Sequence, residues 1–135
     1  MGARHSGRVV AVQALYNYEM SRDKRALSDF RWTSGDLHEE SLLFARMLAE
    51  GTFEHLAAID KMIFNASEKR DFDRIARVDL AVLRVSIYEM CFQAQPLPSR
   101  IVIDEAIEIS KSLSADESYK FVNGILDKLS READR

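Results

Sequence analysis

The sequence predicts an all-α fold in a single domain spanning residues 1–135. Its residues are 47% apolar and 30% charged, which is the composition of a folded globular protein and not of a disordered chain. The chain holds only five glycines and two prolines, too few for the frequent turns of a β-sandwich or barrel. Apolar residues recur instead at three- and four-residue spacing, which is the period of a helix face.

The first half of the chain is predicted to contain two or three helices. Helical spacing predicts the first over residues 3–20, followed by a short amphipathic segment at 24–32. Residues 36–64 contain one glycine and no proline, so they form one long helix or two helices joined near Gly51. The polar stretch 65–71 is expected to be a loop.

The helix predicted for residues 72–91 is the most apolar and is therefore expected at the centre of the fold. At 100° per residue its polar positions narrow to two seams. The first seam contains Arg77, Arg84 and Tyr88, and the second contains Asp79, Ser86 and Glu89. An acid such as Asp79 is normally avoided between apolar flanks unless its carboxylate reaches solvent or a cationic partner.

Two further helices are predicted after a break at residues 95–98, where two prolines disfavour helix. The first of these spans about residues 100–113. The second begins at the sequence Ser114–Glu117, which has the pattern of a helix-capping box.

Charge is distributed unevenly along the chain. The net charge is −3, but residues 1–25 carry +3 and the remainder carries −6. Residues 1–25 thus form a basic head and the remainder an acidic body, and two segments of opposite charge can bind two different partners. Cys91 is the only cysteine, which excludes an internal disulfide and suits a cytoplasmic protein. No apolar run approaches the roughly 18 residues of a membrane span, so no membrane contact is expected.

No pattern in the sequence supports catalysis. His5 lies in the basic head, and the other two histidines have no nucleophile motif beside them. Asp104, Glu105 and Glu108 could form an acid–base set but are more typical of a solvated helix face. The histidine spacing fits no metal site and the glycines form no nucleotide-binding loop. We therefore expect a binding protein with no catalytic residue, cofactor or metal.

Two segments combine cations with aromatic residues. Arg4, His5 and Arg8 form a basic leader, and Tyr16 follows two turns later. Guanidinium groups bind phosphates, and an aromatic ring can stack on an unpaired base, so RNA is a candidate ligand. Tyr119–Phe121 repeats this mixture. The alternative is that the leader is a solvated tail and that the rings belong to the core.

Four segments carry a family resemblance that covers nearly the whole chain. They are Ala11–Tyr16 (AVQALY), Val82–Glu89 (VLRVSIYE), Ile103–Ile109 (IDEAIEI) and Lys120–Asp127 (KFVNGILD). In order and approximate spacing they resemble the bacterial transcription antitermination factor family NusB, and the last octet is the most specific. The leader of well-studied members is an uninterrupted arginine run, whereas Gly7 separates the arginines here. This departure predicts weaker RNA binding or a greater dependence on a protein partner.

The resemblance implies a NusB-like fold of two small helical bundles, about residues 1–66 and about 67–135, packed across each other around the central helix. It implies binding to the single-stranded boxA element of ribosomal RNA leaders together with NusE, a small-subunit ribosomal protein. The pair would nucleate an antitermination complex with NusA, NusG and RNA polymerase. The implied RNA contacts are Arg4, His5, Arg8, Tyr16, Glu117, Lys120 and Phe121. Asp79 is the implied NusE contact, and some relatives form homodimers, so that state stays open here.

Two alternatives are kept beside this interpretation. The acidic body is compatible with a helical protein adaptor that never binds RNA. A NusB-like domain also precedes the catalytic domain of rRNA cytosine methyltransferases, but no methyltransferase motif occurs before Arg135, which disfavours that alternative.

Overall fold

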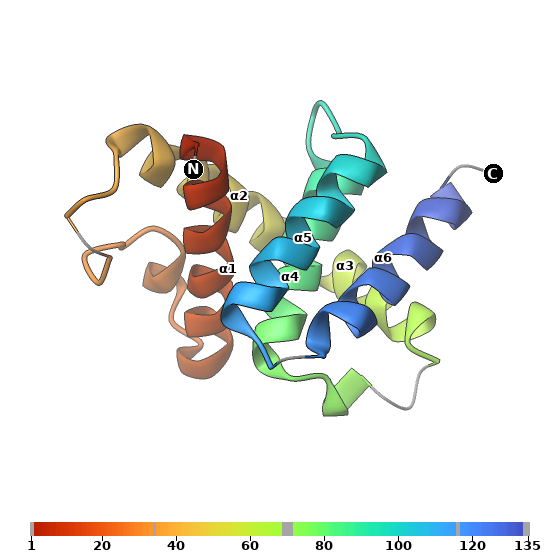
Figure 1. Ribbon diagram of the computed structural model, residues 1–135. Helices are drawn as coiled ribbons and strands as arrows, with labels where there is room; N and C mark the ends of the chain where they lie inside the picture. Colours follow the sequence, from red (N-terminus) through yellow and green to blue (C-terminus); the bar gives the residue numbers. More distant parts are fainter. Residues whose placement is uncertain (1, 34, 69–71, 116, 134–135) are drawn as a thin grey trace.

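The described residues form six α-helices and no strand. The computed structural model describes residues 2–33, 35–68, 72–115 and 117–133 (Figure 1). The helices are α1 (Ala3–Ser21), α2 (Glu39–Glu54), α3 (Leu56–Ala66), α4 (Arg77–Ile87), α5 (Ser99–Leu113) and α6 (Ser118–Ala133). Single 3-10 turns occur at Lys24–Leu27 and Phe72–Arg74, and a π-helical turn at Tyr88–Phe92 continues α4. The all-α prediction is confirmed.

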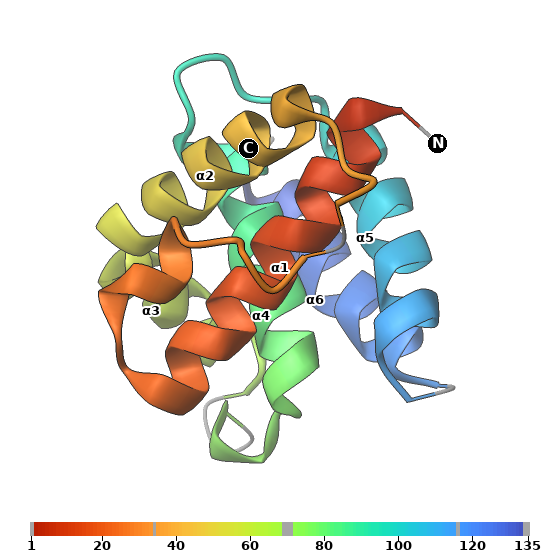
Figure 2. The same cartoon turned by 90° about the vertical axis from the view of Figure 1, so that its left-hand side faces the viewer.

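Helix α4 is the centre of the fold, as its apolar sequence predicted. It contacts all five other α-helices of the described chain, and Leu80, Leu83 and Ile87 on it are completely buried. In Figure 1, α1 lies on one side of α4 and α6 on the other, and α5 runs in front of α4; Figure 2 shows α1 lying across α4. The helix begins later than predicted, because the extended backbone of Ala76 (φ −56°, ψ 139°) precedes it.

Two helices, not one, occupy the segment predicted for residues 36–64, and they join at His55 instead of at Gly51. Gly51 lies inside α2, where a Cβ atom would overlap the ring of Tyr88. His55 Nδ1 lies 3.0 Å from the carbonyl oxygen of Gly51. The His55 ring also packs against Tyr88 and Phe92, with centroid distances of 5.8 and 4.9 Å. These aromatic contacts fix the bend between α2 and α3.

Gly7 allows a close approach of α1 and α2. A Cβ atom at this position would come within 2.7 Å of Phe44 Cδ2 and 2.8 Å of the Ser41 carbonyl oxygen. Both distances are shorter than van der Waals contact, so a larger residue would push the helices apart. The glycine that interrupts the arginines of the leader therefore has a packing role.

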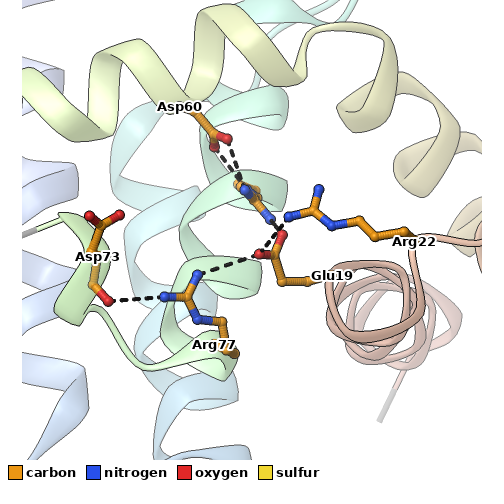
Figure 3. Close-up of polar contacts among 6 residues, drawn as sticks. Glu19, Arg22, Asp60, Asp73 and Arg77 are labelled. Carbon is orange, nitrogen blue, oxygen red and sulfur yellow. Dashed lines mark hydrogen bonds and ion pairs between the residues drawn. The ribbon is translucent and has the colours of Figure 1, made fainter.

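Arg84 is buried in an ion network that joins α1, α3 and α4, although the sequence placed it in a polar seam. Its Nε and Nη2 each donate to the Asp60 carboxylate at 2.8 Å, and Nη1 donates to Glu19 at 2.8 Å. Figure 3 shows that the Glu19 carboxylate also faces Arg22 and Arg77, at 3.2 and 3.4 Å. Burial alone would raise the pKa of Glu19, but the hydrogen bond and charge of Arg84 outweigh it and leave that pKa lowered.

Helix α6 begins at Ser118, later than the predicted capping box. Ser114 is instead the C-cap of α5, directly after its last residue, and Asp116 lies outside the described residues. None of the described helices is both long enough and apolar enough to cross a membrane.

Candidate nucleic-acid interface

Arg4 is the exposed cation of the leader, in the first turn of α1. Its guanidinium carbon lies 4.5 Å from the centroid of the Phe44 ring on α2. Stacking engages the face of a guanidinium and leaves the N–H groups at its edge available to an anion. Arg4 is thus held in place by an aromatic ring while it can still bind a phosphate.

His5 and Arg8 are engaged by carboxylates of other helices. His5 Nδ1 lies 2.6 Å from Glu105 Oε1 on α5. Arg8 Nε donates to both carboxylate oxygens of Glu89, at 2.8 and 3.1 Å, and the Glu89 side chain is only 4% exposed. Arg8 therefore neutralises a buried acid. Glu105 was expected on a solvated helix face, but it is half-buried because His5 and Arg8 of the leader pack against it.

The same corner brings three potential metal ligands together. One ligand atom each from His5, Glu105 and Glu108 lies within 4.8 Å of the others, a grouping that spacing along the chain does not reveal. However, Arg8 Nη1 lies 3.8 Å from Glu105 Oε1. A positive charge at that distance disfavours a bound cation.

Tyr16 lies further along α1 and is partly buried. Its ring packs against the core and lines a surface pocket together with Trp32, Val78 and Leu113. Leu113 is the last residue of α5, a few residues before α6 begins. Tyr16 therefore lies beside the C-terminal end of α5.

The start of α6 presents an aromatic ring and a cation at the surface. Phe121 is 37% exposed, whereas Val122 and Leu126 on the inner face of the helix are completely buried. Lys120 Nζ lies 2.6 Å from the Glu117 carboxylate, and both side chains are well exposed. The Phe121 ring is therefore available to a ligand.

The structure separates the implied RNA residues into two groups. In both Figure 1 and Figure 2 the leader lies at the N-terminal end of α1 and the start of α6 lies toward the opposite end of the molecule. A ligand that touches both groups must be extended. A single-stranded nucleic acid has that shape.

Asp79, the implied partner contact, is buried in the first turn of α4. It is 5% exposed, and its Oδ1 accepts a hydrogen bond from Ser114 Oγ at 2.5 Å. A carboxylate in the first turn of a helix is also stabilised by the helix dipole. Burial of this acid is thus balanced by a hydrogen bond that the sequence did not indicate, because Ser114 is 35 residues away.

Known proteins match this chain both in sequence and in fold. Residues 5–131 match the family model described as the NusB family. The transcription antitermination protein NusB of Treponema pallidum (strain Nichols) is 36% identical over 133 residues, which cover 96% of this chain and 94% of that protein. The protein of the same name from Desulfitobacterium hafniense is 39% identical, over 94% of this chain and 87% of its own length.

Solved structures agree with the sequence matches and confirm the predicted NusB-like fold. A structure of T. maritima NusB superposes with a TM-score of 0.83 at 35% identity, over 96% of this chain and 91% of that one. A crystal structure of the antitermination factors NusB and NusE in complex with dsRNA contains a chain of the same fold, with a TM-score of 0.78 at 21% identity, over 96% and 97%. The family match and the relatives above 30% identity decide the assignment: this chain belongs to the NusB family.

Proposed function

We propose that this protein is a cytoplasmic, non-catalytic transcription antitermination factor that binds the single-stranded boxA element of ribosomal RNA leaders together with NusE. The relatives named as antitermination proteins support the role. A NusB chain of the same fold has been crystallised with NusE and dsRNA. The observation that carries the proposal is Phe121, an aromatic ring 37% exposed next to the exposed cation Lys120.

Each implied RNA residue has a role that fits its surroundings. Arg4 binds a phosphate, because it is exposed and stacked on Phe44. His5 and Arg8 hold the leader against α5 and against the π-helical turn that continues α4, and so keep Arg4 in position. Tyr16 offers the edge of its ring to a base. On α6, Phe121 stacks on a base while Glu117 orients Lys120 toward the backbone.

The NusE surface is proposed at the start of α4 and includes Asp79. Oδ1 of Asp79 already accepts a hydrogen bond from Ser114. We therefore expect the negative charge of the carboxylate to attract NusE at the edge of this buried site. Asp79→Asn is the sharpest test, because an amide keeps an acceptor for Ser114 and removes the charge. We expect unchanged thermal stability and NusE binding weakened by about 1–3 kcal/mol in calorimetry. Wild-type affinity for NusE in the folded variant would remove Asp79 from this surface.

The wider assembly and the two-bundle division belong to the same proposal. The protein joins NusA, NusG and RNA polymerase through the RNA-bound complex. The division into about residues 1–66 and about 67–135 is supported by the packing of α1 on α2 and of α5 on α6, with α4 in contact with all of them.

RNA binding with and without NusE tests the proposed function. Fluorescence anisotropy with a labelled boxA RNA should show binding that is tighter with NusE than without it, and tighter than binding to a scrambled RNA of equal length. If the protein with NusE binds both RNAs equally, boxA recognition is wrong. If it binds NusE and neither RNA, the protein is an adaptor.

A further inference from the structure

Gly124 lies on the exposed face of α6, and the described part of the chain gives no reason for a glycine there. A Cβ atom at Gly124 would meet no atom within 4 Å, and its φ is not positive. Gly7 and Gly51 differ, because a Cβ atom at either would overlap an aromatic ring. A glycine within a helix destabilises it relative to alanine, since it loses more backbone freedom on folding. The helix is therefore weakened at Gly124 with no compensating contact from the described residues.

The neighbours of Gly124 on the helix surface have the chemistry of a nucleic-acid site. Helical spacing places Lys120 and Phe121 one turn before it and Lys128 one turn after it. All of these side chains are exposed. Lys128 Nζ makes one long contact, 3.4 Å from the Ala66 carbonyl oxygen, so its charge is not neutralised there. Gly124 is thus a helix position without a side chain that lies between two lysines and next to the ring of Phe121.

The acidic residue one turn after Gly124 already forms an ion pair. Asp127, also one turn after Gly124, forms an ion pair with Arg131 on the same helix. Its carboxylate is directed to that arginine and not to the two lysines. Lys120 pairs with Glu117 at 2.6 Å, but both side chains are well exposed, so this pair is weak and a phosphate can replace the carboxylate. The face around Gly124 therefore suits an anionic, flexible ligand better than an apolar one.

We propose that Gly124 is a point of close approach for single-stranded RNA. The sugar–phosphate backbone passes over the bare Cα between Lys120 and Lys128 while a base stacks on Phe121. This inference rests on the proposed RNA-binding function and extends the RNA surface by about two turns along α6, to Lys128. Lysine charges on both sides match phosphates, and a missing side chain lets a backbone approach closely.

Gly124→Ala tests the inference, because stability and binding should change in opposite directions. Alanine favours helix and meets no atom, so the melting temperature should rise by a few degrees. The dissociation constant for boxA RNA, measured by anisotropy in the presence of NusE, should rise about fivefold or more, as on loss of a weak base stack. Asn123→Ala is the matched control, since Asn123 is exposed on the same turn but lies 100° away around the helix. It should raise the melting temperature without changing the RNA dissociation constant.

Other outcomes separate this inference from the proposed function. If the wild-type protein binds boxA RNA and Gly124→Ala binds it equally, the close approach at Gly124 is wrong and the proposed function stands. If Gly124→Ala weakens binding to NusE alone, or abolishes self-association in sedimentation, the occupant of this face is a protein and the RNA inference is wrong. A lower melting temperature would show that glycine serves the fold itself. If the wild-type protein does not bind RNA, both proposals fail.

Discussion

Both ends of α1 carry charges that oppose the helix dipole, but the surroundings of these charges differ between the two ends. An acid, Glu19, lies near the C-terminal end, and the basic leader lies at the N-terminal end. Helix dipoles favour the reverse arrangement. Glu19 is enclosed by the arginines of the network in Figure 3. At the other end the Arg8 side chain is largely buried and paired with Glu89. Arg4, in contrast, is exposed and stacks on the ring of Phe44.

We infer from this difference that exposure, and not charge, separates the ions that stabilise the fold from the ions proposed to bind RNA. Removing one partner of an enclosed pair leaves the other buried without compensation and affects folding. Removing an exposed cation affects the anionic ligand that it would contact. The same chemical group, arginine, is therefore expected to serve folding at Arg84 and Arg8 and is proposed to bind the ligand at Arg4.

Arg84→Ala should have the largest effect, because it opens the enclosed network. The Glu19 and Asp60 carboxylates would then lie near each other without their shared cation. We expect a loss of about 3–5 kcal/mol in the free energy of unfolding, measured by urea denaturation. Arg25→Ala is the control, since it breaks an exposed pair with Asp23 and should leave the urea midpoint unchanged. Equal midpoints for the two variants would contradict a structural role for the network.

Phe121→Ala extends the comparison to aromatic residues. We expect RNA affinity to weaken by about 1–3 kcal/mol, the loss of one base stack, with little change in melting temperature. Phe30, only 9% exposed, provides the opposite case. Phe30→Ala should destabilise the fold by about 3–5 kcal/mol. A large drop in the melting temperature of Phe121→Ala would assign that ring to the core.

Acid should weaken the enclosed end of α1. Burial alone would raise the pKa of Glu19 above its usual 4.5, but the hydrogen bond and charge of Arg84 lower it. A pKa lower in the folded state contributes stability above about pH 4.5, which is lost as the pH falls through the lowered value. The stability difference between wild type and Glu19→Gln should therefore be largest near neutral pH and shrink in acid. A constant difference from pH 7 to pH 3 would contradict this assignment.

The sequence predicted helix positions well where periodicity alone determines them. The predicted helices at 3–20 and 100–113 correspond to α1 and α5 within a residue at each end. It failed where distant contacts decide the backbone. The bend at His55 depends on Tyr88 and Phe92, and such contacts leave no local pattern.

The candidate site was predictable in its residue types but not in its pairing. The basic leader and the acid Glu89 were both visible in the sequence, yet Arg8 and Glu89 are 81 residues apart. Only the packing of α1 against α4 brings them together. The exposed ring of Phe121 could not be distinguished from a core ring by spacing alone, because it borders the buried face of α6.

The salt dependence of RNA binding, compared between Arg4→Ala and Arg8→Ala, tests the distinction between exposed and enclosed arginines most directly. Arg4→Ala should flatten the slope of log K against log salt by roughly one unit and leave stability unchanged, because one phosphate contact is lost. Arg8→Ala should lower stability by about 1–3 kcal/mol, since Glu89 loses its partner, and change the slope less. An unchanged slope for Arg4→Ala in a protein that binds boxA RNA would contradict the account and make Arg4 a solvated side chain.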